Sequence, residues 1–470
     1  MLLPPPATLP LPADTPLPWG RHFRENFGVA YPVVISQLGH IAVNVADSVI
    51  VGRLGELPLA GVALATSVFV VVLVAGLGIS MGLTPLVAAA AARHRTHRLA
   101  LLLGAGIAVC AAAGVGLAAL GWAATWLLPH LGEPPAVVAL AGPFLRLLAV
   151  SMVPLMLFQA LRQFAEGLAL TREAMVISLG ANLVNIGLNY VFVFGLLGFP
   201  ALGMIGSAWA TLLARVLMVA AMAAWFWRAL RFAPYRARLA VRWKYARRML
   251  GLGFPIAGQM MLETGAFVFS ALMMGWLGTT ALAAHQIAIN VASVTYMAAS
   301  GIGAAATVRV GQFAGAGRHH EVRRAASSAL WLAFGFMVLM GVALVVARHQ
   351  LPWFYVTTPD GAAARALAAE LLIIAALFQM SDGVQVAALG VLRGLEDVRV
   401  PGLISFVAYW VIALPLGYWL AFPLGYGPAG LWAGLCLGLT VSAVALTWRV
   451  RWLSASPPNP PSTSSGQALS

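Results

Sequence analysis

Of the 470 residues in this chain, 61% are hydrophobic and only 9% are charged, whereas soluble globular domains carry about 25% charged residues. This composition excludes a water-soluble globular protein and predicts that lipid surrounds most of the chain. The formal net charge of +14 does not indicate a nucleic-acid-binding protein, because the sequence contains no soluble domain on which basic residues could form a binding surface.

The two ends of the chain differ in composition from the rest. Residues 1–24 are rich in proline and carry no positive charge before Arg21, so they lack the basic and apolar regions of a cleavable signal peptide. Residues 451–470 are rich in serine and proline. We expect both segments to be disordered tails.

Twelve apolar stretches, separated by short polar breaks, lie between these tails. About 20 apolar residues suffice for a helix to cross a bilayer, so the sequence predicts an all-α membrane protein with twelve transmembrane helices. A basic linker, 228–248, separates an N-terminal six-helix bundle (25–227) from a C-terminal six-helix bundle (249–450). The helices are expected at 27–50, 58–83, 99–128, 136–161, 173–197 and 201–227, then at 249–276, 280–306, 325–349, 363–391, 400–421 and 428–448.

The distribution of basic residues predicts how these helices are oriented. Of the 28 Lys and Arg residues, 23 fall in the termini or in every second connection between helices. The other connections hold Arg53, Arg348 and Arg365, and Arg146 and Arg215 fall inside helices. Because basic loops are retained in the cytoplasm, we expect both termini to be cytoplasmic.

The two halves of the chain also resemble each other, which indicates pseudo-symmetric bundles. The stretch GRLGELPLAGVALA (52–65) is similar to GWLGTTALAAHQIA (275–288), so that position 52 aligns with position 275. At a slightly longer offset, Gly167 and Gly203 pair with Gly394 and Gly430. Transporters are commonly built from such duplicated bundles, with the substrate path between them.

Three acidic residues are expected within the membrane: Asp47 in the first helix, Glu263 in the seventh and Asp382 in the tenth. An ionised side chain at the bilayer centre costs roughly 2.5 to 3.5 kcal/mol. Polar stripes with helical spacing direct these residues toward a protein interior. The stripes comprise His40, Asn44 and Asp47; Asn182, Asn185 and Asn189; Gln259 and Glu263; and Gln379, Asp382 and Gln385.

Buried carboxyl groups of this kind can serve two chemistries. Among amide and hydroxyl oxygens a carboxylate suits a hard cation such as Na⁺, and a desolvated carboxyl group can instead carry a proton. A structural alternative is that each group only forms a hydrogen bond with a neighbouring helix. Aromatic and methionine side chains are candidates for lining an adaptable substrate cavity: Phe267, Met273, Met274, Tyr296 and Met297.

Several segments resemble one family of transporters. ADSVIVGRLG (46–55), GFPIAGQMMLETGAF (253–267), LAAHQIAIN (282–290), ATVRVGQFAGAGR (306–318) and FQMSDGVQVAALGVLRGLEDVRVP (378–401) are similar, in this order, to motifs of the multidrug and toxic compound extrusion family. Glu263 and Asp382 match the acidic pair of its NorM-like branch. The similarity extends over roughly residues 25–450.

The resemblance implies a V-shaped pair of bundles that exports amphipathic or cationic small molecules in exchange for Na⁺ or H⁺, without a cofactor. It implies a coupling cation at Glu263 and Asp382, with Na⁺ as one candidate, and a coupling or drug-binding site at Asp47. Polar residues expected to support these sites are Asn185 and Asn189 beside Asp47, together with Asn44, Gln259, Gln379, Gln385, Gln286 and Asn290. It further implies a monomer in a bacterial inner membrane.

Other functions fit the sequence less well. An ATP-driven pump needs a GxxxxGK[ST] loop, and a membrane-embedded enzyme would be expected to show a motif such as HExxH or GxSxG; the sequence contains none of them. A flippase of lipid-linked precursors is the closest alternative. Such a protein would line its cavity with several basic residues, whereas only Arg146 and Arg215 are expected within the helices.

Overall fold

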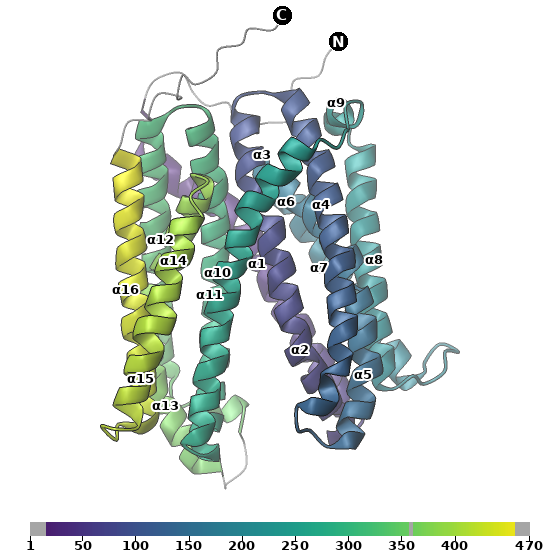
Figure 1. Ribbon diagram of the computed structural model, residues 1–470, viewed down its shortest axis with the longest axis vertical. Coiled ribbons are helices and arrows are strands. Elements are labelled where there is room, and N and C mark those ends of the chain that lie inside the picture. Colours follow the sequence, from purple (N-terminus) through teal and green to yellow (C-terminus); the bar gives the residue numbers. More distant parts are fainter. Residues whose placement is uncertain (1–15, 357–360, 456–470) are drawn as a thin grey trace, which may run out of the picture.

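The computed structural model describes residues 16–356 and 361–455. Within these ranges the regular secondary structure is entirely helical, and twelve helical segments are long and apolar enough to cross a membrane. The predicted fold class and helix count are therefore confirmed. Figure 1 shows two groups of helices that meet near the end where the described chain begins and ends, and that diverge toward the opposite end.

The N-terminal lobe contains the first six spans, two of which are broken into shorter helices. Its helices are α1 (Trp19–Gly52), α2 (Glu56–Met81), α3 (Leu83–Ala92), α4 (Thr96–Ala123), α5 (Pro135–Val150), α6 (Met152–Gly167), α7 (Thr171–Phe194) and α8 (Met204–Arg228). Short helical turns lie at Ala124–Trp126 and Leu128–His130. The turn Leu230–Phe232 and helix α9 (Ala233–Arg236) connect the lobes.

The C-terminal lobe contains the last six spans. Its helices are α10 (Trp243–Trp276), α11 (Thr279–Gly315), α12 (His319–Ala347), α13 (Ala362–Gly394), α14 (Arg399–Phe406), the π-helical segment η6 (Val407–Ala413), α15 (Leu414–Ala421) and α16 (Gly427–Ala455). A short turn, Leu351–Phe354, precedes α13.

Several helices extend beyond their predicted ends, and nearly all do so on the side of the termini. Residues 19–24 and 451–455 are helical, which corrects the prediction that they belong to disordered tails; residues 1–15 and 456–470 lie outside the described residues. Arg162, Arg309 and Arg393 belong to helices and not to connections. Hydropathy locates only the apolar part of a span. The helices are longer than this part, because backbone hydrogen bonding continues into the polar residues beyond it.

The backbone repeats between the lobes as the duplicated sequence predicts. Gly55 and Gly278, which the repeat aligns with each other, immediately precede α2 and α11 and have φ of 114° and 113°. Such values are accessible mainly to glycine. The proposed pairing of Gly203 with Gly430 is out of register, because Gly203 and Gly427 are the residues that share a φ of 56° at the start of α8 and α16.

The lobes meet where the first helix of each crosses the second span of the other. A Cβ atom on Gly78 of α2 would lie 2.3 Å from Cα of Ala257 on α10, and one on Gly301 of α11 would lie 3.0 Å from N of Val34 on α1. These contacts are equivalent, since the repeat that aligns position 52 with position 275 also aligns Gly78 with Gly301 and Val34 with Ala257. Side chains larger than hydrogen at the glycines would force the helices apart.

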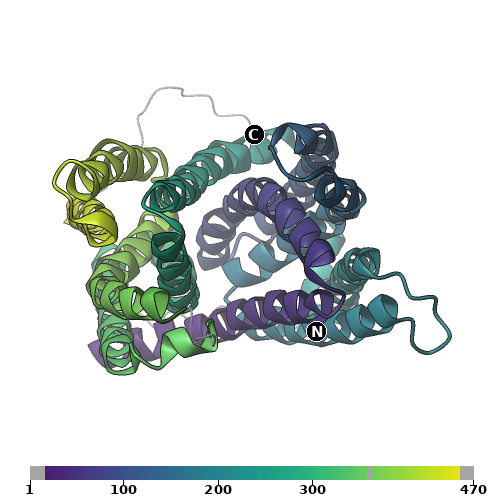
Figure 2. The same cartoon turned by 90° about the horizontal axis from the view of Figure 1, so that it is seen from below.

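The beginning of α1 is held against the C-terminal lobe by polar side chains. Figure 2 shows α1, in purple, running from the N-terminal lobe to the green helices, and α1 contacts both α11 and α12. Glu25 of α1 forms an ion pair with Arg309 of α11, whose side chain is only 1% exposed. His22 Nε2 lies 2.8 Å from Oε2 of Glu321 on α12, and Asn26 donates to Ser328 Oγ at 2.7 Å.

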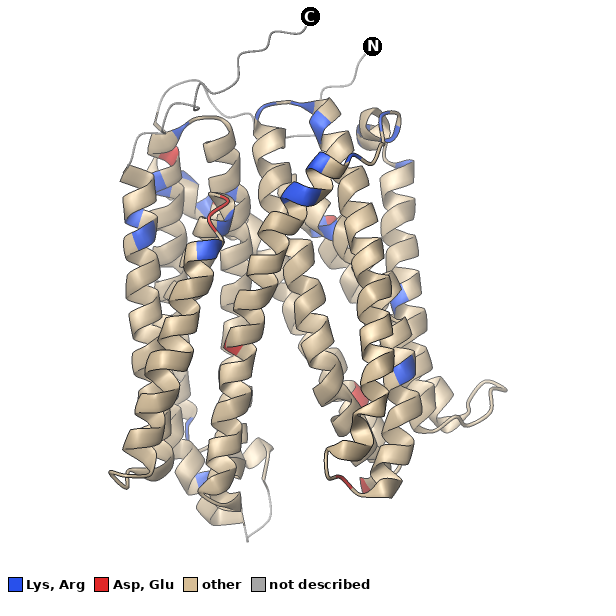
Figure 3. Cartoon of the chain, in the orientation of Figure 1, with Lys and Arg blue, Asp and Glu red and all other residues tan. Residues whose placement is uncertain are grey.

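Lys and Arg residues gather at the end of the molecule where the lobes meet, as Figure 3 shows. Arg93, in the connection between α3 and α4, donates to the carbonyl oxygen of Gly315 across the lobe interface. The contacts between the lobes therefore lie at the basic end of the molecule.

We expect the substitution Arg309→Gln to lower the thermal stability of the detergent-solubilised protein strongly. Removing one partner from a buried ion pair costs about 3–5 kcal/mol, because the other charge stays buried without compensation. Arg21→Gln is the matched control, since Arg21 also pairs with Glu25, at 2.7 Å, but its side chain is 40% exposed. Its cost should stay within about 1 kcal/mol. Equal melting temperatures for the two variants would contradict the role assigned to Arg309.

Candidate functional site

Glu263 is the centre of a buried hydrogen-bond network in the C-terminal lobe. Its Oε2 accepts a hydrogen bond from Gln259, one turn earlier on α10, at 2.8 Å. Its Oε1 accepts from Gln385 of α13 and from the hydroxyl of Tyr409, each at 3.2 Å. Gln385 also donates to the Tyr409 hydroxyl, at 2.8 Å. Three spans therefore converge on this one carboxyl group, and all of its hydrogen-bond donors here are neutral.

Tyr409 reaches Glu263 from the π-helical segment η6. Pro415, just past this segment, has no N–H group and cannot provide the normal hydrogen bond to the carbonyl four residues earlier, which loosens the helix there. Trp410, the next residue, donates its indole N–H to the carbonyl oxygen of Leu262 at 2.9 Å. Such π-helical segments occur frequently at functional sites, where they re-aim side chains.

Asp382 of α13 is buried and lies within electrostatic range of Glu263. Tyr296 of α11 is close enough to interact with both carboxyl groups. The guanidinium of Arg393 is also in range of Glu263, but it donates to Gln259 Oε1, at 2.8 Å. The site thus contains two carboxyl groups and one permanently charged cation.

Gln379 precedes Asp382 by three residues on α13, and its side chain is buried. It connects α13 to two neighbouring helices by hydrogen bonds. Its Oε1 accepts from the hydroxyl of Thr295 on α11 at 3.0 Å, and its Nε2 donates to the carbonyl oxygen of Met337 on α12 at 3.2 Å. Gln379 therefore positions the helix that carries Asp382.

A second polar site surrounds Asp47 in the N-terminal lobe. The amide nitrogen of Asn189, on α7, donates a short hydrogen bond to Asp47 Oδ1. Asn185 lies one turn earlier on α7 and is buried. Within the described part of the chain the amide oxygens of Asn185 and Asn189 are buried without a hydrogen-bond partner, so both are available as acceptors or cation ligands.

Arg215 of α8 adds a positive charge to this second site. Its guanidinium is in electrostatic range of Asp47, donates to the hydroxyl of Ser151 at 2.6 Å and lies 5.3 Å from the ring centroid of Phe69. His40 of α1 is in electrostatic range of Arg215 as well. The carboxyl group of Asp47 therefore has a cationic counterpart within its own lobe.

The structure brings together some of the predicted residues and separates others. Gln259 and Gln385 contact Glu263 directly, and Asn189 contacts Asp47. Asn44, Gln286 and Asn290, proposed as supporting groups, have exposed side chains on α1 and α11 and are not among the buried groups around the carboxyl residues.

Sequence reasoning does not assign Tyr409, Arg393 and Arg215 to these sites. Tyr409 lies in an aromatic stretch without polar periodicity, and its position depends on the π-helical segment. Arg393 follows the apolar part of its span, so its place in the sequence suggests a loop. Arg215 falls inside a helix, and its lone charge within an apolar span is the signal that could have placed it beside Asp47.

Neither site has the ligands of a transition-metal centre. Within residues 16–356 and 361–455, no three His, Cys, Asp or Glu side chains lie close enough together to hold a metal ion. The groups that contact Glu263 are the amide nitrogens of Gln259 and Gln385 and the hydroxyl of Tyr409. Within the described residues the amide oxygen of Gln385 is buried without a hydrogen-bond partner.

Two duplicated six-helix lobes with a polar site inside each define a secondary transporter. Comparison with known proteins agrees with this class. The MatE family model matches residues 32–191 and 255–419, more than half of the chain. The second match begins at position 255, which the internal repeat aligns with position 32, where the first match begins.

Curated relatives extend the match to nearly the full chain. The probable multidrug resistance protein NorM of Rhizobium meliloti (strain 1021) is 36% identical over 450 residues, covering 93% of this chain and 96% of the relative. The protein of the same name from Rhodopseudomonas palustris (strain ATCC BAA-98 / CGA009) is 39% identical, covering 93% of each. The multidrug resistance protein MdtK of Yersinia pestis (strain Pestoides F) is 33% identical, covering 92% and 96%.

Solved structures share the fold. The eukaryotic MATE transporter AtDTX14 has a TM-score of 0.83 at 22% identity, over 92% of this chain and 96% of that one. An outward-facing multidrug resistance MATE transporter has a TM-score of 0.84 at 18% identity, over the same shares of the two chains.

The chain belongs to the multidrug and toxic compound extrusion family and is a multidrug efflux transporter, not an enzyme. The predicted family and its NorM-like branch are confirmed. Members of this family use ion gradients and not cofactors, and its multidrug transporters act on small molecules.

We expect Asn189→Ala to destabilise the protein, because it removes the amide that donates to the part-buried carboxyl group of Asp47. Leaving such an acceptor unsatisfied costs about 1–3 kcal/mol, which a melting curve in detergent would detect. Asn44→Ala is the matched control, since Asn44 lies one turn from Asp47 but is exposed. It should change stability by no more than about 0.5 kcal/mol. Equal losses in the two variants would show that the contact between Asn189 and Asp47 contributes nothing.

Proposed function

We propose that the protein exports amphipathic, often cationic compounds from the cytoplasm in exchange for Na⁺ or H⁺, and that Glu263 and Asp382 hold the coupling ion. The observation that carries this proposal is the charge of their site. Both carboxyl groups are buried, and the hydrogen bonds to Glu263 come from neutral donors. A buried charge without compensation is costly, so the ionised pair requires a cation or a proton.

A count of charges gives the number of ions. Glu263 and Asp382 carry two negative charges when ionised, and Arg393 supplies one positive charge within range. One negative charge is left, which one Na⁺ or one proton neutralises. Occupation and release of this single ion would change the charge buried between α10, α13 and η6, and so alter the relative stability of the transporter's conformations.

The site at Asp47 differs, because Arg215 balances its charge. The net charge of Asp47 and Arg215 is zero when both are ionised, whereas Glu263 and Asp382 leave one negative charge beside Arg393. We assign Asp47, Asn185 and Asn189 to substrate binding, with the two free amide oxygens accepting hydrogen bonds from polar groups of the substrate.

We further propose that the basic end of the molecule faces the cytoplasm, so that both termini are cytoplasmic and the protein is a monomer in a bacterial inner membrane. The positive-inside tendency supports this orientation, as does the gathering of basic residues seen in Figure 3. The contacts between Gly78 and Ala257 and between Glu25 and Arg309 then close the cytoplasmic side, which corresponds to an outward-facing conformation.

The two arginines that the sequence placed within spans, Arg146 and Arg215, do not form the basic cavity expected of a flippase of lipid-linked precursors. Arg146 is exposed and lies 5.6 Å from the ring centroid of Trp122. Arg215 is engaged with Ser151 and Phe69 inside the N-terminal lobe. These two arginines belong to separate environments and do not form a joint phosphate site.

We expect Glu263→Gln and Asp382→Asn each to reduce ion-driven efflux of ethidium from reconstituted vesicles by at least about tenfold, since either change removes the negative charge that requires the ion. Na⁺ and pH gradients should be imposed separately, so that the gradient that drives the wild type identifies the coupling ion. Asp47→Asn should keep the response to that gradient but raise the KM for ethidium.

Glu370→Gln is the matched control for this experiment. Glu370 is an acidic residue on α13, the helix of Asp382, but its side chain is exposed, so efflux should equal that of the wild type. Normal ion-driven efflux in both Glu263→Gln and Asp382→Asn would refute the assignment of the coupling site.

The charge count also predicts how efflux responds to membrane potential. Exchange of one monovalent cation for one ethidium cation moves no net charge, so a potassium diffusion potential set with valinomycin should leave the ethidium efflux rate unchanged. Efflux of an uncharged substrate should accelerate when the potential drives cations inward. Strong acceleration of ethidium efflux would mean that more than one ion enters per cycle.

A further inference from the structure

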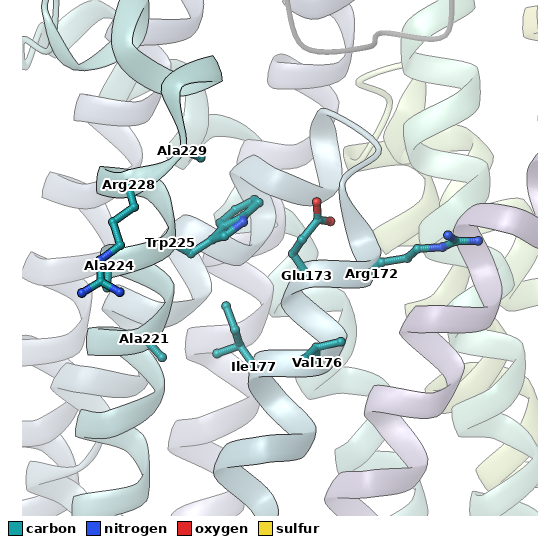
Figure 4. Close-up of a pocket in the computed structure, with 9 residues that line it drawn as sticks. All are labelled: Arg172, Glu173, Val176, Ile177, Ala221, Ala224, Trp225, Arg228 and Ala229. Atoms are coloured by element: carbon teal, nitrogen blue, oxygen red, sulfur yellow. The ribbon is translucent and has the colours of Figure 1, made fainter.

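A groove lies between α7 and α8 on the outside of the N-terminal lobe, away from both polar sites. Its volume is about 750 Å³. Nine residues line it: eight belong to these two helices, and Ala229 follows α8 (Figure 4). Arg172 and Arg228 lie at its rim, near the start of α7 and at the end of α8, which is the basic end of the molecule. The Arg172 side chain extends toward α1, where its guanidinium lies 5.5 Å from the ring centroid of Tyr31.

The rim of this groove is positively charged. Arg172 and Arg228 are exposed, and within the described residues Arg228 takes part in no ion pair. Glu173, the acidic lining residue, is neutralised by Arg231, whose guanidinium lies 2.6 Å from its carboxylate. Arg231 in turn lies 4.9 Å from the ring centroid of Trp225. Two arginines without an acidic partner therefore lie at this end of the groove, with their guanidinium groups directed apart and that of Arg172 turned toward α1.

The deeper part of the groove is apolar. Val176 lies one turn into the membrane from Arg172, and Ala224 lies one turn in from Arg228, so each follows its arginine on the same helical face. Val176 is 62% exposed, and Ile177 and Ala221 continue the lining. The two alanines have short side chains, which keep the space between the helices open.

We propose that this groove binds an anionic phospholipid of the cytoplasmic leaflet, with the phosphate at Arg228, the charge of Arg172 adding to the attraction, and an acyl chain along the apolar lining. The cationic rim complements the anionic headgroup, and basic pockets between transmembrane helices are known to bind such headgroups. Trp225 lies where tryptophan is enriched, at the boundary between headgroups and acyl chains. A free phosphate ion would leave the apolar lining unused.

The assignment to the cytoplasmic leaflet rests on the proposed orientation, but the existence of the site does not. Lipid binding can be measured on the full-length protein in detergent, without transport and without a membrane. Loss of binding would therefore refute the site, whereas a fault in the proposed transport mechanism would leave the binding result unchanged.

The test is native mass spectrometry of delipidated protein with added dioleoylphosphatidylglycerol, and with dioleoylphosphatidylethanolamine for comparison. We expect the wild type to retain phosphatidylglycerol preferentially and the double variant Arg172→Gln/Arg228→Gln to bind it on the order of tenfold more weakly. Arg95→Gln/Arg98→Gln removes the same charge from exposed positions at the same end of the lobe and should bind as the wild type does. If phosphatidylglycerol binding weakened equally in both double variants, general surface charge would explain the effect, and the proposal would be overturned.

A second variant tests the apolar part of the site while keeping both arginines. Ala224→Trp fills the groove, and we expect it to weaken phosphatidylglycerol binding several-fold. Ala112→Trp, at an exposed position on α4, is its matched control and should have no effect. Unchanged binding in Ala224→Trp would show that no acyl chain occupies the groove and would overturn the proposal.

Discussion

The arrangement of the two lobes depends on the close crossing of α2 with α10 and of α11 with α1. At both crossings a glycine faces the backbone or a short side chain of the other lobe: Gly78 faces Ala257, and Gly301 faces Val34. In a bilayer apolar side chains gain little by leaving lipid, so close backbone approach is a main source of attraction between helices. Because the two contacts are related by the internal repeat, they hold the lobes together symmetrically and confine the joint to the basic end.

Polar contacts of α1 reinforce this joint. The Glu25–Arg309 pair and the contact of His22 with Glu321 attach the beginning of α1 to the C-terminal lobe. Near the other end of the same helix, Asp47 is bonded to Asn189 of the N-terminal lobe. Helix α1 therefore links the lobes mechanically. Any rearrangement that opens the basic end must either separate buried charges or bend this helix.

Sequence patterns predicted the features that depend on local periodicity. The twelve spans, the duplication and the proximity of Asp47 to Asn189 all follow from hydropathy or from polar residues at helical spacing. Features that depend on contacts between distant helices were not predictable in this way. Arg309 is buried because Glu25 lies beside it, and Tyr409 reaches Glu263 because a π-helical segment redirects it. Neither pairing can be recognised from the residues that neighbour it in the sequence.

The duplication also shows at which equivalent positions the two lobes carry different charges. In the alignment of the two halves, Glu263 corresponds to His40 and Asp47 corresponds to Ser270. When Gly203, just before α8, is aligned with Gly427, the first residue of α16, Arg215 corresponds to Leu439, a fully buried core residue. The N-terminal lobe thus holds one acid and one arginine within electrostatic range of each other, whereas the C-terminal lobe holds two acids and one arginine. Since burial disfavours a charge without compensation, this asymmetry is the physical basis for the proposal that the coupling ion binds in the C-terminal lobe and the substrate binds near Asp47.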